Sequence, residues 1–165
     1  MQIKDNFLQS HELEHLQSVL LGCNFPWYYN YFIVHKDKDS TQDFQFVHTF
    51  YRADPIGFQD VHSSAFQMLY PIIQLLDIKA LIRIKANLRS RTINPNIPVY
   101  HTDNKYDSNT SIFYVNTNNG YTIFEDGTKV ESVENRIVTF PANTLHTGVS
   151  QTDEKARVVI NLNYF

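Results

Sequence analysis

The second half of the sequence consists of short strand patterns separated by turn residues, and no other feature limits the fold as strongly. At least seven strand-like segments follow one another between residues 81 and 165. Asn119-Gly120 and Asp126-Gly127 lie between such segments, and the Asn-Gly pair predicts a type I′ hairpin turn. Short strands with frequent turns, preceded by helices, are typical of a jelly-roll barrel and argue against a parallel α/β sheet. The predicted fold class is therefore mainly β with flanking helices.

The first half of the sequence predicts two helices that would support this barrel. Ser10 is the expected N-cap of the first helix, which carries an apolar stripe and ends before Gly22. Ser63 or Ser64 is expected to cap the second helix. Pro71 should kink that helix or mark a restart, because proline removes a backbone donor.

Two aromatic segments, residues 25–34 and 43–52, have the composition of strands. Their large side chains are expected to pack in the sheet or in the core, and the alternative is that they line a substrate entrance. The side chains in question are Trp27, Tyr28, Tyr29 and Tyr51.

A length of 165 residues with 42% hydrophobic content predicts a single domain with a buried core. We expect residues 1–80 to supply supporting helices and strands, and residues 81–165 to form the jelly-roll core. A net charge of −3 gives no general attraction to nucleic acid or to anionic membranes, and no apolar stretch reaches the ~18 residues of a membrane span. Cys23 is the only cysteine, so no internal disulfide is expected and a cytoplasmic protein is predicted. The oligomeric state is not indicated.

The segment 81–89 alternates between apolar and polar residues, as a strand with two different faces does. One face should pack against the helices and consists of Ile82, Ile84, Ala86 and Leu88. The other face should point into the barrel or, at a sheet edge, into solvent, and consists of Arg83, Lys85, Asn87 and Arg89.

Four chemically distinctive residues follow this strand. His101 and Asp103 stand two positions apart in VYHTD, and because side chains alternate in extended backbone, both can reach one ion. His146 comes 43 residues after Asp103, and two histidines with one carboxylate form the facial set of ligands that non-haem Fe(II) oxygenases use. Arg157 follows eleven residues later, and its planar guanidinium can bind a carboxylate through two hydrogen bonds.

A second HxD sequence, His35-Lys36-Asp37, lies in the polar run VHKDKDSTQD, whose composition predicts a solvated loop. Neither His48 nor His62 has a basic residue eleven positions downstream, whereas His146 has one. Order and spacing therefore favour the later set as the metal site.

The stretch from Leu81 to Phe165 resembles the core of Fe(II)/2-oxoglutarate-dependent dioxygenases, particularly their prolyl-hydroxylase-like branch. The segments that carry the resemblance are RIKANL, SIFYVN, ENRIVTFPANTLHTG and the closing RVVINLNYF. This short chain, with NNGYTIFEDG between those strands, also resembles oxygenases encoded by marine bacteriophages. A phage-encoded protein would act in the host cytoplasm. The resemblance implies a cupin-like double-stranded β-helix and an iron-dependent hydroxylase.

The resemblance also implies roles for individual residues. His101, Asp103 and His146 would hold Fe(II), and Arg157 with the Tyr114 hydroxyl would bind the far carboxylate of 2-oxoglutarate. Further cosubstrate contacts would come from Asn87, from Ile112, from Asn161 beside the arginine, and from Lys85 as an additional candidate.

The implied partners are 2-oxoglutarate and O2, with ascorbate as an optional addition, and the implied substrate is a peptidyl side chain such as proline or a small molecule. The closing strand departs from the family's pattern. Val159 and Asn161 stand where threonine or serine is frequent, and Asn163 stands where tryptophan is common. These departures concern the cosubstrate's far carboxylate and the choice of substrate, and they leave the metal ligands untouched.

Two alternatives use the same residues. Two histidines, an aspartate and water also make a catalytic zinc site, in which Glu125 or Asp107 would serve as general base, but Arg157 would then have no role. The other alternative is a non-catalytic jelly roll, a ligand-binding or structural viral protein whose histidines are satisfied core residues.

Overall fold

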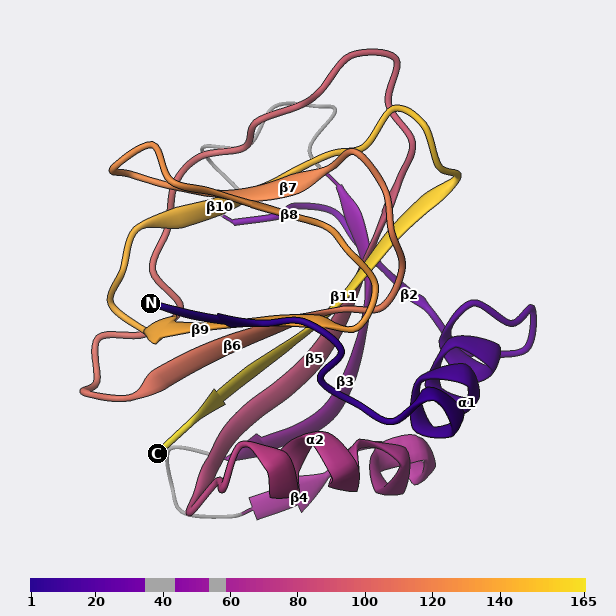
Figure 1. The fold of residues 1–165 in the computed structure, drawn as a ribbon, viewed down its shortest axis with the longest axis vertical. Coiled ribbons are helices and arrows are strands. Elements are labelled where there is room, and N and C mark those ends of the chain that lie inside the picture. The colour runs from indigo at the N-terminus through magenta and orange to yellow at the C-terminus, as the bar shows by residue number, and fades with distance from the viewer. Residues whose placement is uncertain (35–43, 54–58) are drawn as a thin grey trace.

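The computed structural model describes residues 1–34, 44–53 and 59–165, which form two antiparallel sheets with helices on one side (Figure 1). Within these residues the larger sheet has eight strands, in the order β1 (Gln2–Lys4), β9 (Arg136–Pro141), β6 (Asn109–Tyr114), β11 (Ala156–Tyr164), β5 (Leu81–Ser90), β3 (Gln45–Ala53) and β2 (Tyr28–Asn30), with β4 (Gln59–Val61) paired to β3. The smaller sheet has the order β10 (His146–Val149), β7 (Tyr121–Phe124) and β8 (Lys129–Glu131). The prediction of a mainly β fold with flanking helices is confirmed. The HxD sequence at residues 35–37 lies outside the described residues.

The described helical segments all precede β5 and are α1 (Ser10–Leu20), the 3-10 helix η1 (Ser64–Leu69) and α2 (Tyr70–Leu75). The expected N-cap at Ser10 is wrong by one position. Gln9 has the extended backbone of an N-cap, and its N–H donates to Glu12 Oε2 at 3.0 Å. The cap at Ser63 and the restart at Pro71 are confirmed, since η1 gives way to α2 there. Every helix in the described part of the chain is too short or too polar to cross a bilayer.

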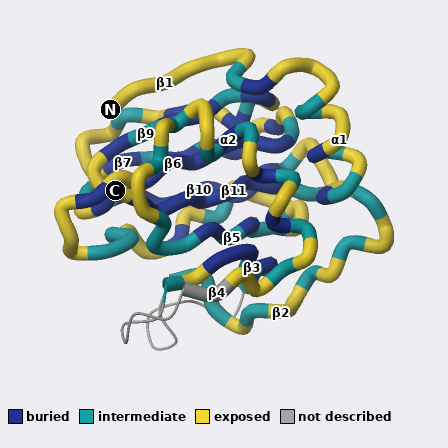
Figure 2. Tube along the Cα trace, turned by 90° about the horizontal axis from the view of Figure 1, so that it is seen from below, coloured by how far each residue is buried: buried dark blue, intermediate teal, exposed yellow. Residues whose placement is uncertain are grey.

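The main core lies between the helices and the outer face of the larger sheet. Ile84 and Ala86 of β5 are fully buried in one apolar cluster with Leu16 of α1 and Leu69 of η1. Burying a leucine or isoleucine side chain contributes about 1.5–3 kcal/mol to stability. Figure 2 shows the buried segments running through the central strands, with exposed residues on the helices and connections around them. The expected direction of the apolar face of β5 is confirmed for Ile84, Ala86 and Leu88, whereas Leu81 packs against this cluster in place of Ile82.

A second apolar cluster holds the smaller sheet against the larger one. Its members are Ile112, Tyr114, Phe124, Val130, Val138, Phe140 and Val159. The rings of Phe124 and Phe140 pack edge to face with centroids 4.9 Å apart, and Phe140 also packs against the ring of His146 at 4.8 Å. This cluster therefore sits directly beside one of the predicted metal ligands.

The hairpin predicted at Asn119-Gly120 is wrong. β6 belongs to the larger sheet and β7 to the smaller one, so the chain crosses between sheets at this point. Neither residue has the positive φ that a type I′ turn requires. The Asn119 N–H instead donates to the Asp153 carboxylate at 2.9 Å. Glycine is needed at position 120 because a Cβ there would lie 2.8 Å from Arg157 Cδ and 2.9 Å from the Val149 carbonyl oxygen.

The four aromatic side chains in question divide between the core and the surface. Tyr51 is buried in the main core and Trp27 packs against it, as predicted. Tyr28 and Tyr29 are exposed on β2.

Candidate functional site

His101, Asp103 and His146 converge in the fold, with candidate ligand atoms within 4.8 Å of one another. His146 is the first residue of β10, and His101 pairs with it in an antiparallel bridge in which each backbone N–H donates to the other's carbonyl oxygen at 3.0 Å. The two imidazole rings lie 4.7 Å apart between centroids. Asp103 projects to the same side as His101, which is the outcome that its i+2 position predicts.

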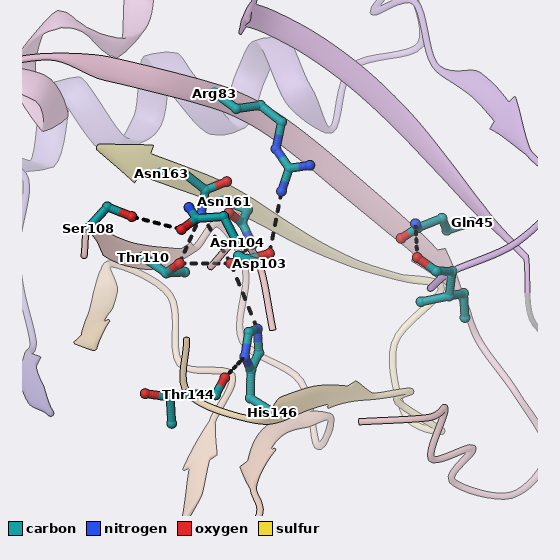
Figure 3. A network of polar contacts seen from close by, with 11 residues as sticks. Gln45, Arg83, Asp103, Asn104, Ser108, Thr110, Thr144, His146, Asn161 and Asn163 are labelled. Carbon is teal, nitrogen blue, oxygen red and sulfur yellow. Dashed lines mark hydrogen bonds and ion pairs between the residues drawn. The ribbon is translucent and has the colours of Figure 1, made fainter. Parts of the chain in front are cut away.

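The Asp103 carboxylate is held by side chains from three strands of the larger sheet (Figure 3). Its Oδ2 atom accepts hydrogen bonds from Thr110 Oγ1 at 2.9 Å, Asn163 Nδ2 at 3.1 Å and Asn161 Nδ2 at 3.3 Å. Arg83 Nη2 lies 3.4 Å from the other oxygen, Oδ1. These contacts orient the carboxylate before any ion binds.

The hydrogen bonds and charges of the three residues suit a metal ligand set. His146 Nδ1 lies 2.9 Å from the Thr144 carbonyl oxygen and donates to it, which leaves Nε2, 4.0 Å from Asp103 Oδ2, as the nitrogen that can bind an ion. Burial, followed by repulsion from His146, lowers the pKa of His101 to about 4, which keeps its imidazole neutral at pH 7. Burial opposes the charge on Asp103, but the neighbouring His146 and Arg83 outweigh it and the pKa of Asp103 is lowered.

These residues fit a divalent metal ion. Their candidate ligand atoms lie within 4.8 Å of one another, and two imidazoles with one carboxylate are a donor set that divalent first-row metals bind. Neutral imidazoles and an ionised carboxylate are also the forms in which these side chains bind metals.

A pocket of about 320 Å³ opens beside the three residues. Strands β5, β6 and β11 form one wall, β7 and β10 another, and residues 30 and 32–34 with Gln45 a third. Asp103 supplies the only carboxylate among the described side chains that line it. Four cationic side chains also line it: Arg83, Lys85, Arg89 and Arg157. A pocket of this size and charge favours small anionic ligands, since it lies at the low end of the roughly 300–1,000 Å³ of small-molecule sites.

Arg157 is buried in this pocket, with 4% of its surface exposed. Its Nε donates to Ser132 Oγ at 2.8 Å and its Nη2 to Thr122 Oγ1 at 3.3 Å, and its Cζ lies 5.6 Å from the centre of the Tyr114 ring. No carboxylate within the described residues forms an ion pair with it. Burial lowers the pKa of Arg157, although arginine remains charged. A buried guanidinium without a counterion is costly, so the site is arranged to receive an anion.

Two glycines make room for this arginine. A Cβ at Gly148 would lie 3.4 Å from Arg157 Nη1, and a Cβ at Gly120 would lie 2.8 Å from its Cδ. The carbonyl oxygen of Gly148 also accepts a hydrogen bond from Arg89 Nη1 at 2.9 Å. The glycine in HTGV is thus part of the arginine pocket.

The other residues predicted to contact the cosubstrate differ in whether they line the pocket. Asn87 and Ile112 line the pocket, and Asn87 Oδ1 is buried without a hydrogen-bond partner among the described residues. Tyr114 lies behind the pocket, where its hydroxyl donates to Thr122 Oγ1 at 2.8 Å, and its contact with a cosubstrate stays a prediction. Asn161 lines the same pocket, four positions along β11 from Arg157, and its amide donates to Asp103 at 3.3 Å; its contact with a cosubstrate stays a prediction.

Several residues of the site were not predicted from the sequence. Thr110 and Asn163 hold Asp103, while Thr122 and Ser132 hold the arginine. The alternation of side chains along a strand is the sequence signal that points to Thr110 and Asn163. Thr110 shares one face of β6 with Ile112, and position 163 shares one face of β11 with positions 157, 159 and 161.

The sequence matches no family model and no curated protein. Solved structures, by contrast, match over nearly the whole chain. A prolyl hydroxylase from Trichoplax adhaerens, in complex with a peptide of the hypoxia inducible factor oxygen degradation domain, has a TM-score of 0.67 and 15% identity, over 99% of this chain and 82% of that chain. A 2OG-Fe(II) oxygenase family oxidoreductase from Burkholderia pseudomallei has a TM-score of 0.64 and 10% identity, over 97% and 82%. A viral collagen prolyl hydroxylase from Paramecium Bursaria Chlorella virus-1 has a TM-score of 0.59 and 12% identity, over 99% and 88%.

Identities this low establish the fold alone. The chain has the double-stranded β-helix fold of 2-oxoglutarate/Fe(II) oxygenases, as predicted, and it carries a candidate His-Asp-His facial set within that fold.

Proposed function

We propose that this protein is an Fe(II)- and 2-oxoglutarate-dependent dioxygenase that hydroxylates a C–H bond of a peptidyl side chain or a small molecule. One observation carries the proposal. A His-Asp-His set and a buried arginine that forms no ion pair with any described carboxylate lie in one pocket, in the fold that such oxygenases share. A purely structural jelly roll has no use for either feature.

Each residue has a defined task under this proposal. His101, Asp103 and His146 hold the metal, and Arg157 pairs with the far carboxylate of 2-oxoglutarate. Ile112 gives the pocket an apolar wall, which excludes water and strengthens that ion pair. When bound, iron and 2-oxoglutarate supply the oxidation, in which O2 and 2-oxoglutarate yield succinate and CO2 while the substrate gains a hydroxyl group.

The zinc hydrolase alternative is less well supported. It requires a general base near the metal, and neither Glu125 nor Asp107 lines the pocket. Both residues are exposed. The hydrolase also leaves the buried charge of Arg157 unexplained.

The test is to add Fe(II) and 2-oxoglutarate to the metal-free protein without oxygen and to record the charge-transfer absorption band. The wild-type protein should develop the band, and the His146→Ala variant should not. Arg157→Met should need a much higher 2-oxoglutarate concentration to reach the same band. On admitting oxygen, succinate should form in proportion to 2-oxoglutarate consumed. A wild-type protein that binds Fe(II) but gives no band at millimolar 2-oxoglutarate would contradict the proposal.

A further inference from the structure

We propose that the substrate is a small carboxylic acid whose carboxylate binds to Lys85 and Arg83 beside the metal centre. This inference rests on the proposed function and names the substrate class of the same pocket. Its basis is the division of the pocket's cations into two groups at different depths.

The register of the sheet defines these two groups. β5 pairs with β11 so that Arg89 lies opposite Arg157, Lys85 opposite Asn161 and Arg83 opposite Asn163. Paired residues in a sheet point to the same face, so each pair marks one level of the pocket. Arg89 and Arg157 form the deep level. Arg83 and Lys85 lie at the level of the asparagines that bind Asp103.

The deep level already has its ligand under the proposed function. The far carboxylate of 2-oxoglutarate pairs with Arg157, and its near end binds the metal, so both of its negative charges are matched. Arg89 is also engaged, because its Nη1 donates to the Gly148 carbonyl oxygen. The cosubstrate therefore leaves Lys85 without an ion pair to any described residue, and leaves Arg83 with only its long contact to Asp103.

The side chains at the metal level have unused hydrogen-bonding capacity. Lys85 lines the pocket and is partly buried, yet it forms no hydrogen bond or ion pair with any described residue. Arg83 Nε is buried and has no hydrogen-bond partner among the described side chains and backbone, and the contact of Arg83 Nη2 with Asp103 is long, at 3.4 Å. Figure 3 shows that Arg83 extends from β5 toward Asp103 and that much of its guanidinium faces away from that carboxylate. Together the two side chains present an ammonium and a guanidinium edge to the same space.

A carboxylate is the group that this pair fits best. A guanidinium edge matches the two oxygens of a carboxylate, and an ammonium adds a third charge-assisted hydrogen bond. The molecule must be small, because about 320 Å³ has to hold 2-oxoglutarate as well. Gln45 also lines the pocket, but Phe46 pairs with Leu88, so Gln45 lies at the level of Arg89 and away from these two cations. A neutral prolyl side chain would leave Lys85 unpaired and Arg83 with only its long contact to Asp103.

Binding can be measured without turnover in the complex of the protein with Zn(II) and 2-oxoglutarate, because zinc has no redox chemistry. The probes are free L-amino acids and short monocarboxylic acids, each paired with its primary amide, together with a prolyl peptide and a phosphate ester, and binding is followed by calorimetry. At least one acid should bind, and its amide should bind at least 10-fold more weakly. The Lys85→Met variant should bind that acid about 10- to 100-fold more weakly, as expected for loss of a charge-assisted hydrogen bond, with unchanged affinity for 2-oxoglutarate. Lys155→Met removes an exposed lysine and should change neither affinity.

Other outcomes would overturn the inference. Equal binding of acids and amides, or failure of every acid to bind, would remove the carboxylate requirement. Preference for a peptide or a phosphate ester over every free acid would assign the pocket to another substrate class. A Lys85→Met variant that loses affinity for 2-oxoglutarate instead would move Lys85 to the cosubstrate. The proposed function itself stands or falls separately, on the absorption band of the iron complex.

Discussion

Three neighbouring side chains, and not the candidate ligands alone, determine how the Asp103 carboxylate is oriented. Thr110 from β6 and the two asparagines of β11 all donate to Oδ2. Asn163 also donates to Thr110 Oγ1 at 2.9 Å, which fixes the direction of the threonine hydroxyl. Partners of this kind keep a ligand in the geometry that the metal needs.

The Thr110→Val variant should therefore bind metal more weakly. Valine has nearly the shape of threonine but lacks the donor, so the carboxylate loses its shortest hydrogen bond. We expect a loss of about 10-fold in affinity, at the lower end of the effect of removing such a partner. Competition between the protein and a chelator for Co(II) measures it. Thr139→Val is the matched control, because the Thr139 hydroxyl bonds Ser111 and not Asp103. Equal affinities for the two variants would contradict this role of Thr110.

Lys85 gives a second residue-scale prediction, in the pH dependence of stability. Burial, followed by repulsion from Arg83, lowers the pKa of Lys85 from 10.5 to about 8. The folded state then holds its proton less tightly than the unfolded state, so this lysine opposes folding fully below pH 8 and no longer does so above pH 10.5. The shift corresponds to roughly 3 kcal/mol, and because Lys85 is partly exposed we expect about 1–2 kcal/mol.

Urea unfolding of the metal-free protein can detect this effect. Lys85→Met should be more stable than wild type at pH 7, and the difference should shrink as the pH rises from 8 to 10.5. Burial also raises the pKa of Tyr51 and of Tyr114, but both tyrosines are present in each protein and cancel in the comparison. A difference that stays constant over this range would show that burial of the charge is not its cause.

At the scale of elements, alternation along single strands was predictable and pairing between strands was not. The two faces of β5 follow from its sequence alone, and the i, i+2 spacing of His101 and Asp103 follows in the same way. The contact of Asn163 with Asp103 joins residues 60 positions apart, so it depends on strand register, which the sequence does not reveal. The error at Asn119-Gly120 has the same origin. The dipeptide favours a turn, but it does not indicate that the flanking strands belong to different sheets.

Strand β10 provides an element-scale prediction, since it contributes both a candidate ligand and the space for the arginine. A methyl group at Gly148 would meet only the flexible end of Arg157, at 3.4 Å. Gly148→Ala should therefore fold with less than about 1 kcal/mol of lost stability, while the methyl group covers part of the guanidinium and weakens 2-oxoglutarate binding. Gly120→Ala should instead lose mainly stability, because its Cβ would lie 2.9 Å from the Val149 carbonyl oxygen, which belongs to the backbone. Thermal unfolding and 2-oxoglutarate titration of the two variants distinguish these effects. Loss of folding in Gly148→Ala would contradict the prediction.

At the scale of the whole molecule, the candidate site is where the two sheets meet. His146 and Gly148 come from the smaller sheet, whereas Arg157 and the residues that hold Asp103 come from the larger one. A metal ion and a dicarboxylate bound there would link both sheets. Such ligands bind only the folded chain, so they should stabilise it by about 2.7 kcal/mol at concentrations 100-fold above their dissociation constants. For a chain of this length that corresponds to a rise in Tm of roughly 5–10 °C.

Thermal unfolding with Zn(II), and then with Zn(II) plus 2-oxoglutarate, should separate the two parts of the site. The Tm of the wild-type protein should rise on addition of Zn(II) and rise again on addition of 2-oxoglutarate. His146→Ala should show neither rise, and Arg157→Met should show only the rise with Zn(II). Without ligands, Arg157→Met should be at least as stable as wild type, because methionine spares the fold a buried charge that has no counterion among the described residues. The exposed Arg91 supplies the control, since Arg91→Met should keep both rises. If Arg157→Met retains the full rise with 2-oxoglutarate, the buried guanidinium does not receive the cosubstrate, and its position in the pocket needs another explanation.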